Sequence, residues 1–188
     1  MNTKKIIAFA LCFAFIFIAS CSGIEQPTDE QIEKAYESAF EAIWWFDVDN
    51  MPLEDFNVYE VIDGMNYFKV KHSEIKTMAD LRKYLENLFI VSFVDKLLDG
   101  DFYGQRYRDI DGSLYVAAAA RGTNQFKGAE TYEIIRENNK KIIYRVTVAD
   151  LEWNDEEEDM VIIGNTTHDN IYEYIKGKWV FSKFEMVR

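Results

Sequence analysis

The segment TYEIIRENNKKIIYRVTVADLEW, residues 131–153, predicts two β-strands joined by a tight turn. β-Branched and aromatic residues recur through Thr131–Glu137 and through Ile142–Trp153, as is typical of strands. Only the polar pair Asn138-Asn139 and two lysines separate the two runs. A connection this short indicates an antiparallel hairpin, because parallel strands need a crossover of about a dozen residues or more.

The same signals continue from residue 103 to the end of the chain. They predict further strands at Tyr103–Ile110, Leu114–Arg121, Met160–Gly164 and Ile171–Val187. The short glycine-bearing links Asp111-Gly112 and Lys176-Gly177 are typical of hairpin turns. We therefore expect an antiparallel sheet in the C-terminal half.

Helical signals dominate the N-terminal half. Thr28 with Gln31 has the spacing of a capping box at the start of a helix. Apolar residues follow at intervals of three and four, which predicts a long amphipathic helix: Ile32, Ala35, Tyr36, Ala39, Phe40, Ile43 and Phe46.

Two shorter helices are predicted before the sheet. Thr77 with Asp80 and Ser92 with Asp95 have the spacing of helix N-terminal caps. Gly100 predicts the end of the third helix, because glycine readily takes the left-handed cap conformation. Two short strands are expected ahead of these helices, at Val58–Ile62 and Tyr67–Lys71.

Helices followed by antiparallel strands predict an α+β fold, with N-terminal helices packed on a curved antiparallel sheet. The expected architecture is of the cystatin-like or nuclear-transport-factor-like kind. We expect a single domain over residues 28–188, preceded by a tether over residues 21–27.

Residues 1–20 are typical of an export signal. Lys4 and Lys5 precede an uncharged apolar run from Ile6 to Ala19, which is shorter than the ~20 residues that a membrane-spanning helix needs. The run ends in Ile18-Ala19-Ser20-Cys21, which resembles the lipobox of bacterial lipoproteins. That resemblance implies that Cys21 becomes the lipidated first residue of the mature protein. The predicted location is the extracytoplasmic face of the cell membrane, to which the lipid anchors the protein.

The mature chain is strongly acidic. Loss of Lys4 and Lys5 with the signal leaves 19 Lys and Arg against 33 Asp and Glu, a difference of −14. Binding of a nucleic-acid backbone requires clustered basic residues, so the balance argues against a nucleic-acid partner.

The sequence offers no recognisable catalytic or metal-binding motif. Cys12 leaves with the signal and Cys21 is acylated, so no thiol remains for a disulfide or a nucleophile. His72 and His168 are far apart in the sequence and lie in polar contexts, which predicts surface histidines. We therefore expect no metal, no cofactor and no enzymatic activity.

Two features are candidates for partner binding. The run Asp155-Glu156-Glu157-Glu158-Asp159 predicts a solvated loop between two strands, with Trp153 beside it as an aromatic anchor. Arg121 has two interpretations: an ion pair with a strand carboxylate that fixes the sheet, which we favour, or a contact with a partner.

Several segments in the middle of the chain resemble the DL-endopeptidase inhibitor family, the IseA family, of Gram-positive bacteria. The matching segments are Thr77-Met78-Ala79-Asp80-Leu81-Arg82-Lys83-Tyr84-Leu85, Phe89 with Val94 to Leu98, Asp111-Gly112-Ser113-Leu114-Tyr115-Val116, and Ala120-Arg121-Gly122. The resemblance implies a secreted protein that binds papain-like endopeptidases, which cut the D-glutamyl–diaminopimelate bond of peptidoglycan, and so restrains cell-wall lysis. Ordinary signal peptides release such proteins, whereas we expect Cys21 to tether this one.

Two other function classes stay open at this point. One is a membrane-anchored module that binds a small molecule or glycan in an apolar pocket without catalysis. The other is a hydrolase, which requires a buried histidine beside a carboxylate. We expect a monomer in each case.

Overall fold

The part of the chain that the structure describes has the predicted α+β fold, with three helices and two four-stranded antiparallel sheets. The computed structural model describes residues 23–118, 121–156 and 158–187. The predicted signal peptide, Cys21 and Glu157 lie outside the described residues.

The long first helix and the second helix begin where the sequence predicts. Helix α1 spans Asp29–Asp47, and the Thr28 hydroxyl accepts a hydrogen bond from the backbone N–H of Gln31 in a complete capping box. Helix α2 spans Met78–Glu86, and Thr77 and Asp80 form the same reciprocal arrangement.

The predicted cap of the third helix is wrong. Helix α3 spans Val91–Asp99, and its N-cap is Ile90, so Ser92 lies within the first turn. A tertiary contact sets this start, because the N–H of Ile90 donates to the carbonyl of Phe181 at 3.0 Å. The end of α3 is as predicted, with Gly100 in the left-handed conformation at φ +88°.

The first sheet is formed by β1 (Tyr59–Ile62), β2 (Met65–Lys69), β3 (Tyr107–Ile110) and β4 (Ser113–Ala117), in the order β1-β2-β4-β3. Strand β3 begins four residues later than predicted, because Gly104 takes a left-handed turn at φ +77° and its N–H donates to the Gly100 carbonyl. Strand β4 stops short of Arg121, whose N–H instead donates to the Val48 carbonyl at the end of α1.

The second sheet is a meander of β5 (Lys127–Asn138), β6 (Lys141–Asn154), β7 (Asp159–Ile175) and β8 (Lys178–Lys183), in that order. The predicted break between Gly164 and Ile171 does not exist, since β7 is continuous. Its polar middle is stabilised by cross-strand contacts with β6, where Arg145 forms an ion pair with Asp169 at 2.7 Å.

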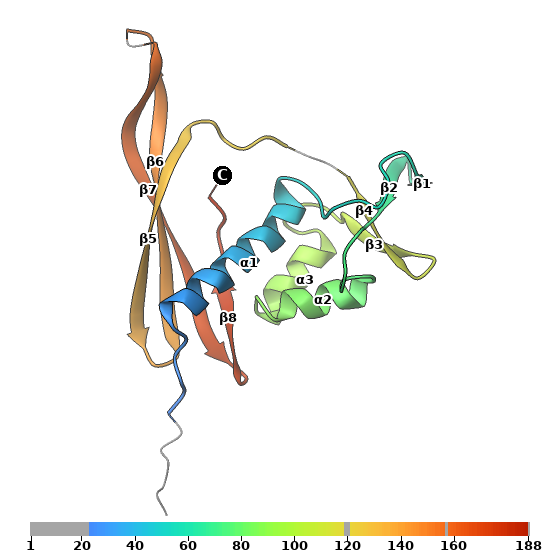
Figure 1. The fold of residues 1–188 in the computed structure, drawn as a ribbon, viewed down its shortest axis with the longest axis horizontal. Coiled ribbons are helices and arrows are strands. Elements are labelled where there is room, and N and C mark those ends of the chain that lie inside the picture. Colours follow the sequence, from blue (N-terminus) through green and yellow to red (C-terminus); the bar gives the residue numbers. More distant parts are fainter. Residues whose placement is uncertain (1–22, 119–120, 157, 188) are drawn as a thin grey trace, which may run out of the picture.

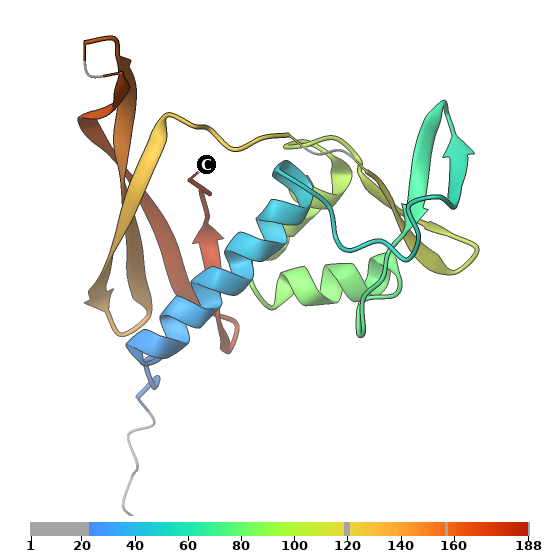
Figure 2. The same cartoon turned by 45° about the horizontal axis from the view of Figure 1, so that its top comes forward.

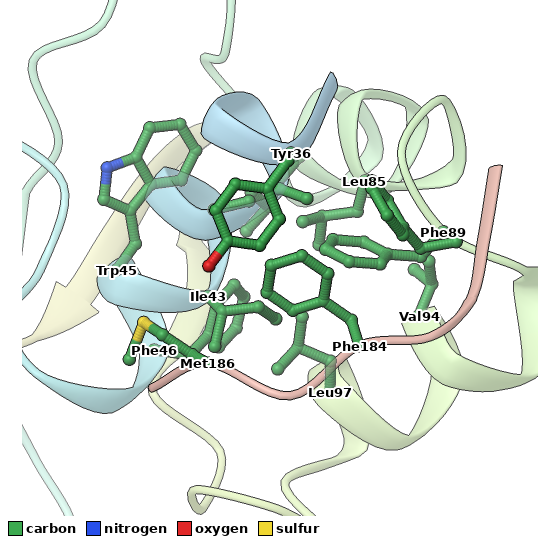
Figure 3. Packing of buried hydrophobic residues seen from close by; sticks show 14 of the residues in the cluster. Tyr36, Ile43, Trp45, Phe46, Leu85, Phe89, Val94, Leu97, Phe184 and Met186 are labelled. Atoms are coloured by element: carbon green, nitrogen blue, oxygen red, sulfur yellow. The ribbon is translucent and has the colours of Figure 1, made fainter. Parts of the chain in front are cut away.

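Helix α1 lies along the β5–β8 sheet, and α2 and α3 pack beside it, as Figures 1 and 2 show. Tyr36 of α1 stacks on Tyr144 of β6 with ring centroids 4.3 Å apart. Figure 3 shows how α1, α2, α3 and the C-terminal segment fill the space between them with apolar side chains, among them Phe89, Leu97 and Phe184. The concave side of the β5–β8 sheet is therefore occupied by the hydrophobic core.

We expect Thr77→Ala to lower the free energy of unfolding by about 1 kcal/mol, because the first turn of α2 loses its side-chain cap. Urea denaturation of the purified protein measures this change. The control is Thr77→Ser, which keeps the hydroxyl and should retain most of the stability. Equal losses for both variants would contradict the capping role.

Candidate functional site

Strands β6 and β7 extend beyond their neighbours and form a two-stranded arm. Strand β5 pairs with β6 only as far as Asp150, and β8 pairs with β7 only from Ile171 onwards. Residues 151–163 therefore project from the sheet, and Figures 1 and 2 show their tip at the opposite end of the sheet from the start of α1. We call this projection, residues 151–163, the arm.

One face of the arm is apolar. Trp153 pairs with Met160, and Leu151 pairs with Ile162, so these four side chains project on the same side. The face is open to solvent, since Trp153 is 53% exposed and Ile162 is 68% exposed. By strand alternation it is the face turned away from α1, because the core residues Val146 and Val148 occupy the other side of β6.

The tip of the arm carries the predicted acidic loop. Asp155, Glu156 and Glu158 connect the two strands, Asp159 begins β7, and all four are exposed. The loop is closed by Asn154, whose side-chain oxygen accepts the N–H of Glu156 at 2.9 Å. Residues 151–163 contain six acidic side chains and no basic one, so the tip is a concentrated negative charge.

A polar cluster at the base of the arm was not predicted from the sequence. The carboxylate of Asp150 forms an ion pair with Lys127 of β5 and accepts the hydroxyl of Thr166 at 2.7 Å. The Lys127 ammonium and the Thr166 hydroxyl lower the pKa of this carboxyl below its usual value. Because the cluster joins β5, β6 and β7, it fixes the direction in which the arm leaves the sheet.

A close approach between β5 and β6 also stabilises the base of the arm. A Cβ atom at Gly128 would lie 3.1 Å from Cδ2 of Leu151, which is tighter than ordinary van der Waals contact. Glycine therefore lets the start of β5 lie against Leu151.

Arg121 forms an ion pair, but with a helix carboxylate rather than a strand carboxylate. Its guanidinium contacts the carboxylate of Asp47, the last residue of α1, and its Nε donates to the Asp47 carbonyl at 3.0 Å. A cation at this position also interacts favourably with the C-terminal end of the helix dipole. The position of Arg121 is structural, and it does not lie on the arm.

We expect Arg121→Gln to lower the free energy of unfolding by about 2 kcal/mol, because the carboxylate of Asp47, only 2% exposed, loses its cation. Arg121→Lys keeps the charge without the paired geometry and should lose about half as much. Guanidinium denaturation measures the loss of stability in both variants. A stability equal to that of the unchanged protein would contradict this role.

The prediction of two surface histidines is wrong for His168. Its side chain is only 15% exposed, and its Nδ1 lies 3.0 Å from a carboxylate oxygen of Glu185. Its Nε2 is buried without a hydrogen-bond partner in the described structure, so this nitrogen cannot reach a substrate in solution in this conformation. His72 is half-buried, and its Nδ1 accepts the backbone N–H groups of Glu74 and Ile75.

Comparisons with known proteins give this chain no family. No family model matches it, and the comparison with curated proteins found no match. The resemblance to the inhibitor family therefore stays a prediction that depends on the segments quoted above.

The described residues were also compared with two structural criteria, a metal-binding cluster and a membrane-spanning helix, and meet neither. They contain no group of three His, Cys, Asp or Glu side chains placed to hold a metal ion. None of their helices combines the length and the apolar character that crossing a bilayer requires.

Proposed function

We propose that this protein is an extracytoplasmic lipoprotein that binds and inhibits a papain-like peptidoglycan DL-endopeptidase and thereby restrains cell-wall lysis. The observation that carries the proposal is the arm, which combines a concentrated negative charge at its tip with an exposed apolar face that includes Trp153. Exposed aromatic side chains surrounded by polar groups are typical of residues that dominate protein–protein interfaces.

The chemistry of the arm suits an enzyme cleft that accepts an acidic peptide. The stem peptide of peptidoglycan carries carboxylates, so a cleft that binds it has to offer complementary positive charge. The acidic tip presents the same sign of charge as that substrate. Inhibition then follows from occlusion: the tip occupies the cleft, while Trp153 and Ile162 pack against its rim.

A second candidate function is a ligand-binding lipoprotein module. A cavity of about 700 Å³ lies beside the β1–β2 hairpin, and its wall includes Phe56 stacked on Phe68 with ring centroids 4.9 Å apart. Its size and aromatic lining are typical of small-molecule sites. We rank it second because the cavity opens on the first sheet, whereas the concave side of the β5–β8 sheet is filled by core side chains.

The proposal is tested by mixing the mature protein with purified papain-like cell-wall endopeptidases. Size-exclusion chromatography follows complex formation, and chromatography of released muropeptides follows hydrolysis. We expect a complex with at least one endopeptidase and a release of muropeptides that falls as the protein is added. A muramidase serves as control, and its activity should be unchanged. Folded protein that neither binds nor slows any endopeptidase would refute the proposal.

A further inference from the structure

The segment that leads from Cys21 to α1 is held against one end of the β5–β8 sheet. The side chain of Gln26 donates to the carbonyl of Asn138, the last residue of β5, and accepts from Arg136 at 3.0 Å. The indole N–H of Trp179 in β8 donates to the carbonyl of Glu25 at 3.4 Å. The start of the described chain therefore lies at the end of the sheet where the β5–β6 and β7–β8 turns lie (Figure 1).

This contact limits the distance between the sheet and a lipid on Cys21. Cys21 lies four residues before Glu25, and four extended residues span at most about 14 Å. A diacylglycerol on Cys21 therefore brings the two turns close to the membrane surface.

The arm lies at the other end of the same strands. Strand β6 runs for 14 residues from the β5–β6 turn to the tip, which corresponds to about 45 Å at 3.3 Å per residue. Two orientations are compatible with the short tether: the sheet stands on its turns with the tip outward, or it lies flat with the tip on the membrane.

The charges of the two ends distinguish these orientations. Lys140 and Lys176 are exposed in the two turns, and neither has an ion-pair partner among the described residues. The exposed Lys178 begins β8, and its ammonium donates to the carbonyl of Glu86. Glu25 lies at the same end, since its carbonyl accepts the indole N–H of Trp179, and Glu137 and Glu173 flank the two turns, so this end is close to neutral. The arm, in contrast, carries six acidic side chains and no basic one. Anionic headgroups attract lysines near the surface and repel the tip once it approaches within about 10 Å.

Aromatic residues complete the membrane-proximal end. Trp179 and Tyr174 lie beside the β7–β8 turn, half-buried, with ring centroids 5.8 Å apart. Tryptophan and tyrosine next to lysine are typical of the bilayer interface.

We propose that the two turns form a docking surface for anionic lipid headgroups, on which the mature protein stands with the arm pointing away from the membrane. This inference depends on the lipidation of Cys21, which is part of the proposed function. Its consequence is that the acidic tip is held about 45 Å outward, where it can meet an enzyme in the cell wall.

The mature chain offers a direct test, because it has no thiol besides Cys21. Asn139→Cys places a single label in the β5–β6 turn, and Glu156→Cys places one at the arm tip. The labelled, lipidated proteins are reconstituted in phosphatidylglycerol vesicles that contain a lipid with a nitroxide on its headgroup as quencher. We expect several-fold stronger quenching at position 139 than at position 156. Equal quenching, or stronger quenching at position 156, would overturn the upright orientation.

The lysines are tested in the Asn139→Cys background. Lys140→Gln with Lys176→Gln should weaken the preference for the upright orientation roughly fivefold per lysine on phosphatidylglycerol and leave it unchanged on phosphatidylcholine. Lys71→Gln, which removes an exposed lysine from the loop after β2, is the matched control and should have no effect. If the quenching at position 139 changes neither with the lipid charge nor with these variants, the headgroup contact is refuted.

Mass spectrometry of the same samples separates this inference from the proposed function. A protein without acyl chains on Cys21 contradicts both the proposed location and the orientation. An acylated protein without a difference in quenching contradicts only the orientation. Neither measurement involves an endopeptidase, so inhibition is judged independently.

Discussion

A variant that combines Trp153→Ala with replacement of the five tip acids by their amides should bind the target endopeptidase several hundred-fold more weakly. Loss of an exposed aromatic anchor at the centre of an interface costs about 2 kcal/mol or more, which is roughly 30-fold in Kd. Neutralising the tip removes the steering of association toward a positive cleft, which is worth roughly tenfold in on-rate at low salt. Surface plasmon resonance measures the affinity, and muropeptide release measures the inhibition.

Two control variants match these changes elsewhere on the surface. Phe56→Ala removes an aromatic side chain that is 69% exposed at the β1–β2 hairpin. Replacing Glu30, Glu33 and Glu37 of α1 by glutamine removes exposed acids from a helix. Both controls should bind as the unchanged protein does. If Phe56→Ala weakens binding more than Trp153→Ala, the contact lies at the aromatic cavity and not on the arm.

A second large effect is expected for Phe181→Ala, which should lower the free energy of unfolding by about 3–5 kcal/mol. Phe181 is completely buried, and its ring lies 4.7 Å from that of Tyr172 and 5.1 Å from that of Phe184. Its backbone also connects β8 to the link between α2 and α3, since its N–H donates to the Leu88 carbonyl at 2.7 Å. Truncation of Phe181 to alanine therefore leaves a cavity where the sheet meets the helices.

Denaturant unfolding followed by circular dichroism measures this loss. Phe181→Leu keeps most of the volume and should cost much less than the alanine variant. Phe56→Ala removes an aromatic ring of the same kind from an exposed position and should change stability by less than about 1 kcal/mol. A similar loss for Phe181→Ala and Phe56→Ala would contradict the packing described above.

Local signals predicted the α+β class and most of the elements. The caps at Thr28 and Thr77 and the glycine at the end of α3 depend on neighbours within a few residues, and all three are confirmed. Errors arose where a distant segment competes with local preference. The link between α2 and α3 pairs with Phe181, and this contact starts α3 at Val91 despite the better capping side chain of Ser92.

The site was predicted in part. The acidic run and Trp153 mark the tip, because like charges resist burial wherever the chain folds. The apolar face could not be predicted, since the run Met160-Val161-Ile162-Ile163 shows no alternation from which a face can be read. A register shift between Asp150 and Leu151 places Ile162 opposite Leu151, and only the long-range pairing of β6 with β7 reveals it.

Arg121 and His168 also show that the sequence alone does not reveal contacts between distant segments. The sequence indicated that Arg121 pairs with a carboxylate, but its partner Asp47 is 74 residues away and belongs to a helix. His168 lies in a polar run that predicts exposure, yet strand alternation turns its side chain toward the core beside Glu185. In both cases the partner is determined by tertiary structure.

Amide hydrogen exchange of the mature protein, measured with and without a bound papain-like endopeptidase, tests most directly whether the arm is the contact surface. We expect slower exchange in the complex for backbone amides of residues 151–163, and unchanged exchange in β1 and β2. Protection of the β1–β2 hairpin with an arm that exchanges as fast as in the free protein would contradict the central claim.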